Sequence, residues 1–230
     1  MRFAVLKFRW RHLVRCLLLH VCFLMPWAAS AGSFDDFFKA AELDNESAIV
    51  GLALRGFDLN TRNEKGEHAL SVALRADSLK VVDFLLTQRS VKVESRNPQG
   101  ESPLMIAAIK GHLGSARQLI RRGAEVNKTG WTPLHYAASR AERDSVDMAR
   151  LMLEHHAYID AESPNKSTPL MMAAHYGHPD TVRLLLEEGA DPSLRNEQGL
   201  TAVDFARRAG RDDMADLVAE ALRAQRQTPR

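Results

Sequence analysis

A short motif, Thr-Pro-Leu-x-x-Ala-Ala, recurs along this chain and constrains its fold more than any other feature. Clear copies cover residues 132–138 and 168–174, and a copy with serine in first place covers 102–108. Weaker copies begin at residues 68 and 201. The proline positions of the five copies are 69, 103, 133, 169 and 202, so they are separated by 34, 30, 36 and 33 residues. A period near 33 residues is typical of repeat proteins built from stacked supersecondary units.

The order of residues in the motif is that of a helix start. Thr132 can cap a helix, because its hydroxyl can accept a hydrogen bond from a free backbone N–H of the first turn. Pro133 then occupies a position where its missing N–H costs nothing. Leu134 and Ala137 share one helical face, and the small pair Ala137–Ala138 allows a neighbouring backbone to come close. We therefore expect one helix to begin at each copy of the motif.

A second apolar segment follows each motif and usually ends at a glycine. Gly56, Gly123 and Gly189 lie where a helix can end in the left-handed conformation that only glycine adopts cheaply. His156 takes the equivalent place in its unit, so we expect a slightly strained residue there. Each unit should therefore contain two helices, and replacing His156 by glycine should stabilise the protein.

The first unit lacks the Thr-Pro opening. Aligning Ala40–Ala41 with the alanine pair of the motif predicts a helix that carries Phe34, Phe37 and Phe38, and a second helix over residues 46–54. An atypical first repeat is expected of a cap, because its outer face has no neighbour. The phenylalanines should fill the space that a preceding repeat would fill.

On these motifs the chain resembles ankyrin-repeat proteins, whose consensus contains the Thr-Pro-Leu-His-x-Ala of residues 132–137. The resemblance implies an all-α fold, an ankyrin-repeat α-solenoid of about six stacked helix-turn-helix units joined by extended finger loops. The expected units cover approximately residues 34–65, 66–99, 100–129, 130–165, 166–198 and 199–222. It also implies a protein that binds other proteins without catalysis, in which His135 and His178 hydrogen-bond neighbouring backbone.

The N-terminal 31 residues have the three-part layout of a secretory signal peptide. Every charge before Asp35 is positive, an apolar run covers residues 16–25, and Ala29-Ser30-Ala31 matches a cleavage site. We expect cleavage between Ala31 and Gly32 and a periplasmic or secreted protein. An uncleaved membrane anchor is the alternative, but the apolar run is shorter than the ~20 residues that span a bilayer.

Cleavage would change the composition of the protein. Five of the 31 Lys and Arg residues and none of the 29 Asp and Glu residues lie in 1–31, so the net charge would become −3. The basic balance of the full chain therefore gives no argument for nucleic acid binding. Cys16 and Cys22 also leave, which removes every thiol. The repeat domain would cover residues 32–222, with a polar tail at 223–230.

No pattern in the mature region indicates catalysis. His155, His156, His175 and His178 could be considered as a metal site, but the family position of His178 favours a structural role. Nucleophile-elbow and phosphate-loop sequences are absent. We predict no enzyme, no cofactor and no bound metal; a hydrolase or metal-binding protein built on the repeat remains an alternative.

Two units break the period of the repeat. Nine residues separate Gly123 from Thr132, whereas twelve separate Gly189 from Thr201, so the finger before Trp131 should be three residues short. Three extra residues lie within 139–145, between the helices of the unit that contains residues 130–165. Insertions in solenoids are placed in loops on one face, often the binding face.

The register also predicts which residues face a partner. Positions just before the motif, just after the alanine pair and at the finger tips should line the concave surface of the solenoid. The candidate partner-binding residues are Trp131, Tyr176, His175, Lys110, Ile109, Arg140, Lys166, Asn165, Gln99 and Arg75.

Trp131 has two interpretations, which the sequence leaves open. With Tyr176, Ile109, Lys110 and Arg140 it resembles a binding hot spot, a kind of site rich in Trp, Tyr and Arg. Alternatively, its ring folds over the shortened finger and fills the gap.

We expect a monomer that binds a single protein partner and has no stable membrane anchor after cleavage. The chain also resembles exported bacterial ankyrin-repeat proteins. Some of those proteins support a catalase under peroxide stress, so a catalase-type enzyme is one candidate partner. A secreted effector that binds host proteins is the alternative function.

Overall fold

The computed structural model describes residues 26–227, with side chains from Gly32 onward. The apolar run and charged start of the expected signal peptide, residues 1–25, lie outside the described part, as do residues 228–230. No helix in the described part is long and apolar enough to cross a membrane.

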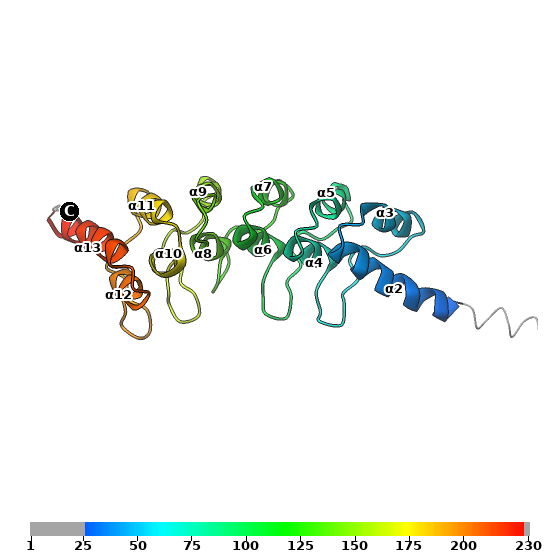
Figure 1. Cartoon of the computed structure of the whole chain (residues 1–230), viewed down its shortest axis with the longest axis horizontal. Helices are drawn as coiled ribbons and strands as arrows, with labels where there is room; N and C mark the ends of the chain where they lie inside the picture. The colour runs from blue at the N-terminus through cyan, green and yellow to red at the C-terminus, as the bar shows by residue number, and fades with distance from the viewer. Residues whose placement is uncertain (1–25, 228–230) are drawn as a thin grey trace, which may run out of the picture.

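The described residues form a row of helix pairs (Figure 1). In chain order the helices are α2 (Pro26–Glu42), α3 (Glu46–Leu54), α4 (Ala69–Arg75), α5 (Leu79–Thr87), α6 (Pro103–Lys110), α7 (Leu113–Arg121), α8 (Pro133–Ala138), α9 (Ser145–Glu154), α10 (Pro169–Tyr176), α11 (Pro179–Glu187), α12 (Ala202–Arg208) and α13 (Asp212–Gln227). The even-numbered helices, here called first helices, lie in one row, and the odd-numbered second helices lie in another above it. Finger loops project from the row of first helices. The expected all-α solenoid of six helix pairs is confirmed for the described residues.

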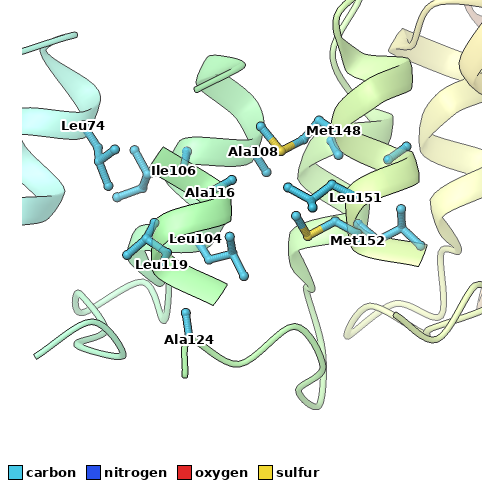
Figure 2. Packing of buried hydrophobic residues seen from close by; sticks show 14 of the residues in the cluster. Leu74, Leu104, Ile106, Ala108, Ala116, Leu119, Ala124, Met148, Leu151 and Met152 are labelled. Carbon is cyan, nitrogen blue, oxygen red and sulfur yellow. The ribbon is translucent and has the colours of Figure 1, made fainter. Parts of the chain in front are cut away.

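The hydrophobic core is continuous but linear. Leu104, Leu134 and Leu170 are fully buried, and each lies in a different first helix, in α6, α8 and α10. Figure 2 shows the same arrangement between neighbouring pairs, where α6 and α7 face α9 through small and branched side chains. The residues that form this layer include Leu104, Ile106, Ala108, Ala116, Leu119, Met148, Leu151 and Met152.

Alanines and glycines allow the close packing of the first helices. Ala137, Ala138, Ala173 and Ala174 are all completely buried. At Gly177, which ends α10, an added Cβ would collide with the carbonyl oxygen of Ala138 and lie 2.8 Å from the Ala173 Cα. Backbone therefore meets backbone at the junction of α8 and α10, and only glycine fits there.

The helix starts largely follow the motif. The hydroxyl oxygens of Ser102 and Thr168 accept hydrogen bonds from the backbone N–H groups of Met105 and Met171, at 3.3 and 3.4 Å. The Thr132 hydroxyl differs from these two, because it lies 2.8 Å from a side-chain atom, His135 Nδ1. The predicted left-handed conformation of His156 is confirmed by a φ of 62°.

Carbonyl groups at the ends of second helices are satisfied by the next unit. The Arg122 guanidinium, which follows α7, donates to the carbonyl oxygens of Leu86 at 3.1 Å and Val91 at 2.8 Å. The last carbonyl groups of a helix have no partner inside the helix, so they can accept hydrogen bonds from the next unit. These bonds join neighbouring units in addition to the apolar core.

Both ends of the solenoid differ from the expected boundaries. Helix α2 begins at Pro26, eight residues before the expected first unit, and runs through the proposed cleavage site at Ala31 and Gly32. Its aromatic cluster is as predicted, since Phe37 and Phe38 are buried and Phe37 contacts Phe57. At the other end, α13 continues to Gln227. Residues 223–227 of the expected tail are therefore helical and exposed.

Candidate functional site: the first-helix face

His135 organises the centre of the first helices. Thr132 donates its backbone N–H to His135 Nδ1 at 3.2 Å, so this nitrogen is an acceptor and the proton is on Nε2. Nε2–H then donates to the carbonyl oxygen of Ser167, in the next unit, at 2.9 Å. Burial lowers the pKa of His135 to about 4, so the ring is neutral. The prediction that His135 bonds neighbouring backbone is confirmed, and the ring serves as a fixed support for the surface above it.

A small apolar pocket opens above His135. Its volume is about 210 Å³. The Trp131 ring stands edge-on to the His135 ring with the centroids 5.3 Å apart, and forms one wall. The pocket is lined by Ile109, Trp131, His135, Tyr136, Ser139 and Met172, which come from three successive units.

A charged network borders this pocket on its N-terminal side. The Tyr136 hydroxyl donates to the Glu101 carboxylate at 3.1 Å, and Asn97 donates to the same carboxylate at 2.7 Å. Arg75 bridges Glu101 at 3.2 Å and Glu67 at 2.9 Å. Burial and the neighbouring carboxylate raise the pKa of Tyr136 to about 12, so the phenol stays protonated and remains a donor. Tyr136 therefore fixes the boundary between the apolar pocket and the charged network.

Several predicted binding residues are already engaged within the protein. Lys110 pairs with Asp77 at 2.8 Å. Arg140 donates twice to Asp144, at 2.9 and 3.1 Å, and once to the Ile109 carbonyl oxygen at 3.0 Å. His175 Nδ1 lies 3.0 Å from the Phe205 carbonyl oxygen. Arg140 and His175 therefore hold loops and helices in place, and Arg75 belongs to the charged network.

Of the remaining candidates, Trp131 and Ile109 are half-buried and the other four are exposed. Tyr176 keeps 53% of its surface accessible and meets the His175 ring edge to face, with ring centroids 4.1 Å apart. Gln99, Asn165 and Lys166 are exposed at finger tips. The structure joins Trp131 and Ile109 in one pocket, but Tyr176 does not line that pocket.

Tyr136 and Met172 were missed by the sequence analysis. Both occupy the fifth position of the motif, where Ile106 is buried. Their apolar character was visible in the sequence, but the same position can face the core or the surface. Only the packing of adjacent units shows that Tyr136 and Met172 are half-buried at the pocket.

None of the histidines considered for a metal site belongs to a cluster of metal-ligating side chains in the described part of the chain. Within residues 32–227, no group of three or more His, Cys, Asp or Glu side chains is placed to hold a metal ion. His178 instead accepts the backbone N–H of Asp180 at 3.1 Å and caps α11.

Two relatives share the repeat but extend well beyond it. The chain is 31% identical to the mouse nuclear factor NF-kappa-B p105 subunit over 166 residues, which is 69% of this chain and 17% of that protein. It is 26% identical to the human transient receptor potential cation channel subfamily A member 1, over 78% of this chain and 17% of the channel. The chain therefore spans about a sixth of the length of these two relatives.

Two solved bacterial structures match the solenoid. One is a chain from the complex of the predatory endopeptidase Bd0816 of Bdellovibrio bacteriovorus with the immunity protein Bd3460, with a TM-score of 0.70 and 29% identity. The match covers 80% of this chain and 97% of that chain. The other is an ankyrin repeat domain from Acinetobacter baumannii, with a TM-score of 0.67, 26% identity and coverage of 80% and 96%.

Family models for ankyrin repeats match most of the described chain. The model for three repeat copies matches residues 37–129 and 90–163, and the model for many copies matches residues 152–206. The motif, the helix pairs and these matches agree, and the chain belongs to the ankyrin-repeat family.

Proposed function

We propose that this protein is a non-catalytic scaffold that is exported to the periplasm, or secreted, and binds one protein partner on its first-helix face. Ankyrin repeats are protein–protein interaction scaffolds, and in repeat proteins the concave surface is the usual binding surface. The N-terminal sequence of residues 1–31 supports export.

The observation that carries this proposal is the pocket walled by Trp131, Tyr136 and Ile109. A volume of about 210 Å³ is smaller than the ~300–1,000 Å³ of typical small-molecule sites, so it suits one apolar side chain of a protein. Trp and Tyr are the residues on which binding free energy is usually concentrated. The charged network at Glu101 and Arg75 can add orientation at the rim.

An enzyme is the partner class that we favour. The similar bacterial chain comes from a complex of an endopeptidase with an immunity protein, which supports an enzyme as the partner. A catalase-type enzyme, implied by the resemblance to exported ankyrin-repeat proteins, belongs to the same class. An ankyrin scaffold would act on such an enzyme by binding, either protecting or inhibiting it.

Photocrosslinking tests the face that is used. A photoreactive amino acid at Tyr176, exposed on the first-helix face, should crosslink a single enzyme in living cells. The same amino acid at Arg117, exposed on second helix α7, is the matched control and should give no product. Equal crosslinking from both positions would argue against a partner on the first-helix face.

Cell fractionation tests export. The intact mass of the periplasmic protein should correspond to a chain that begins at Gly32. Recovery of the full chain from the cytoplasm alone would contradict the proposal. Recovery of the mature chain mainly from the medium would favour the secreted effector that binds host proteins.

A further inference from the structure

The finger before α8, residues 127–131, differs from the regular fingers, and we call it the fourth finger because α8 is the first helix of the fourth unit. In the regular fingers an Asn-x-x-Gly turn is closed by backbone hydrogen bonds, such as Asn97 N–H to the Glu101 oxygen at 3.1 Å and Asn196 N–H to the Leu200 oxygen at 3.0 Å. The fourth finger lacks the three residues that would form this turn. In Figure 1 the loop before α8 reaches less far than the loops before α6 and α10.

An open hollow lies beside the short finger. Its volume is about 810 Å³, and most of its lining comes from the fourth finger and the next one. Lys128, Tyr158 and Lys166 are among the lining residues. Trp131 is not one of them, so its ring leaves the hollow open.

Tyr158 is unusual for its position in the repeat. One hydrogen bond defines this position in the second to fifth units, from the backbone N–H of residue 92, 125, 158 or 191 to a side-chain oxygen of the preceding unit. The other residues at this position are Lys92, Glu125 and Asp191, which are all charged. Tyr158 places an aromatic ring there and leaves 69% of its surface exposed at the hollow.

Trp131 is the second aromatic exception, on the other side of the same finger. The equivalent residues of the other motif-bearing units are Glu67, Glu101, Ser167 and Leu200. Two rings, in two separate hollows, therefore flank the one finger that is too short to cover them.

Two lysines line the larger hollow, and the ammonium group of one of them, Lys166, is available to a partner. Lys128 Nζ donates to the Gly100 carbonyl oxygen at 2.9 Å, and burial and Arg96 lower the pKa of Lys128 despite nearby Glu94 and Glu125. Lys166 is exposed at the tip of the next finger. Neither lysine forms an ion pair with a carboxylate among residues 32–227, although Glu162 also lines the hollow. A carboxylate brought by a partner can therefore pair with Lys166, whereas the Lys128 ammonium already donates to the Gly100 carbonyl oxygen.

We infer that the short finger is the seat of a protruding loop of the partner protein, which straddles residues 128–130. The loop places an apolar side chain against Trp131 and a carboxylate beside Lys166, with Tyr158 covering its flank. The missing residues are those of a tight turn, so a turn of similar size from another protein fits the vacated space. This inference rests on the proposed scaffold function and specifies the partner as one with an acidic, apolar surface loop.

Restoring the finger gives a direct test. Insertion of Ser-Asn-Pro between Lys128 and Thr129 creates an Asn-Pro-Thr-Gly turn like that of residues 97–100. The same insertion into the regular finger, between Glu64 and Lys65, is the matched control. The probe is a phage-displayed library of disulfide-closed seven-residue loops, selected on the purified full-length chain, and the melting temperature of each variant confirms its folding.

We expect selected loops to contain an aromatic or aliphatic residue beside Asp or Glu. Finger restoration and Trp131→Ala should each weaken their binding on the order of 30-fold, the effect of losing one hot spot. Lys166→Glu should weaken it about 5-fold. The control insertion should leave it unchanged.

Loops that bind the restored-finger protein with unchanged affinity would overturn the inference while leaving a scaffold function intact. Selected loops without acidic residues would also overturn it. If no loop is selected and Tyr176 gives no crosslink in cells, the proposed function itself fails.

Discussion

The openings of α4 and α8 occupy the same position in the repeat, yet their buried histidines are in opposite situations. At α8, both ring nitrogens of His135 have hydrogen-bond partners within 3.2 Å. At α4, His68 stands where Thr132 stands in the fourth unit, is 7% exposed, and neither ring nitrogen has a partner within the described chain. Helix α4 also lacks a side-chain cap. Helix starts with the same fold therefore differ in how much they stabilise the solenoid, because their polar groups are satisfied to different degrees.

The largest expected effect comes from breaking the tight junction between α8 and α10. In Gly177→Ala the new methyl group would meet the Ala138 carbonyl oxygen and the α10 backbone, neither of which can move without separating the units. We expect a loss of more than about 3 kcal/mol in the free energy of unfolding, measured with urea.

Gly114→Ala is the matched control, because nothing lies within 4 Å of the added Cβ. It should be neutral or stabilise α7 by up to about 1 kcal/mol. Equal effects of the two substitutions would show that the α8–α10 contact is looser than described.

His135→Ala removes the satisfied histidine itself. It leaves the Ser167 carbonyl oxygen without its Nε2–H donor and opens a cavity beneath Trp131. The expected cost is about 3 kcal/mol. His155→Ala, at an exposed histidine, should change stability by less than about 0.5 kcal/mol. A cost below about 1 kcal/mol for His135→Ala would contradict the structural role of the ring.

The pH dependence separates the histidines further. The folded-state pKa of His135 is about 4, below the unfolded value of 6.5, because burial disfavours the charged ring. Its contribution is therefore complete above pH 6.5 and is lost as the pH falls toward 4. We expect the free energy of unfolding, measured with urea, to decline by about 3 kcal/mol across this window. A flat profile in the wild type between pH 6.5 and 4 would count against a buried neutral His135.

His68→Thr should repair the weaker opening. Threonine supplies the capping hydroxyl found at Thr168, and it removes two unpaired ring nitrogens whose burial, with Arg62 and Lys92, lowers the pKa of His68. We expect a gain of about 1 kcal/mol at pH 7, and a larger gain at pH 5, where the unfolded histidine binds a proton. Thermal melts at the two pH values measure both. A loss of stability would mean that His68 has an unrecognised packing role.

The fourth unit also contains a smaller weakness, at the end of α9. His156 has a φ of 62°, a conformation that costs a non-glycine residue about 1 kcal/mol. His156→Gly should therefore raise stability by up to about 1 kcal/mol, seen as a rise of a few degrees in melting temperature. A lower melting temperature would indicate a side-chain contribution that outweighs the backbone strain.

Much of the fold could be predicted, because the motif at each helix start and the glycine at several helix ends are local sequence signals. The bounds of α3 and the conformation of His156 follow directly from the register. The N-terminal start of α2 and the C-terminal extent of α13 could not be placed, since neither end has a motif or a following unit to define it.

The candidate site was predictable only in part. Trp131 could be predicted as a candidate because no other motif-bearing unit has an aromatic residue at this position. Tyr136 and Met172 fit the pattern, and their exposure depends on how three units pack together. Arg140 appeared available in sequence, but Asp144 and the Ile109 carbonyl group hold its guanidinium.

Every substantial contact between helices joins members of the same or adjacent pairs. A destabilising substitution in one helix pair therefore acts mainly on that pair and its neighbours, whereas in a globular protein with a single core it would destabilise the whole molecule. Helix pairs near an end can open while the middle, with its pocket and short finger, keeps its shape. Substitutions in α4 and in α10 should have additive effects, and the two ends of the protein can evolve almost independently of the surface between them.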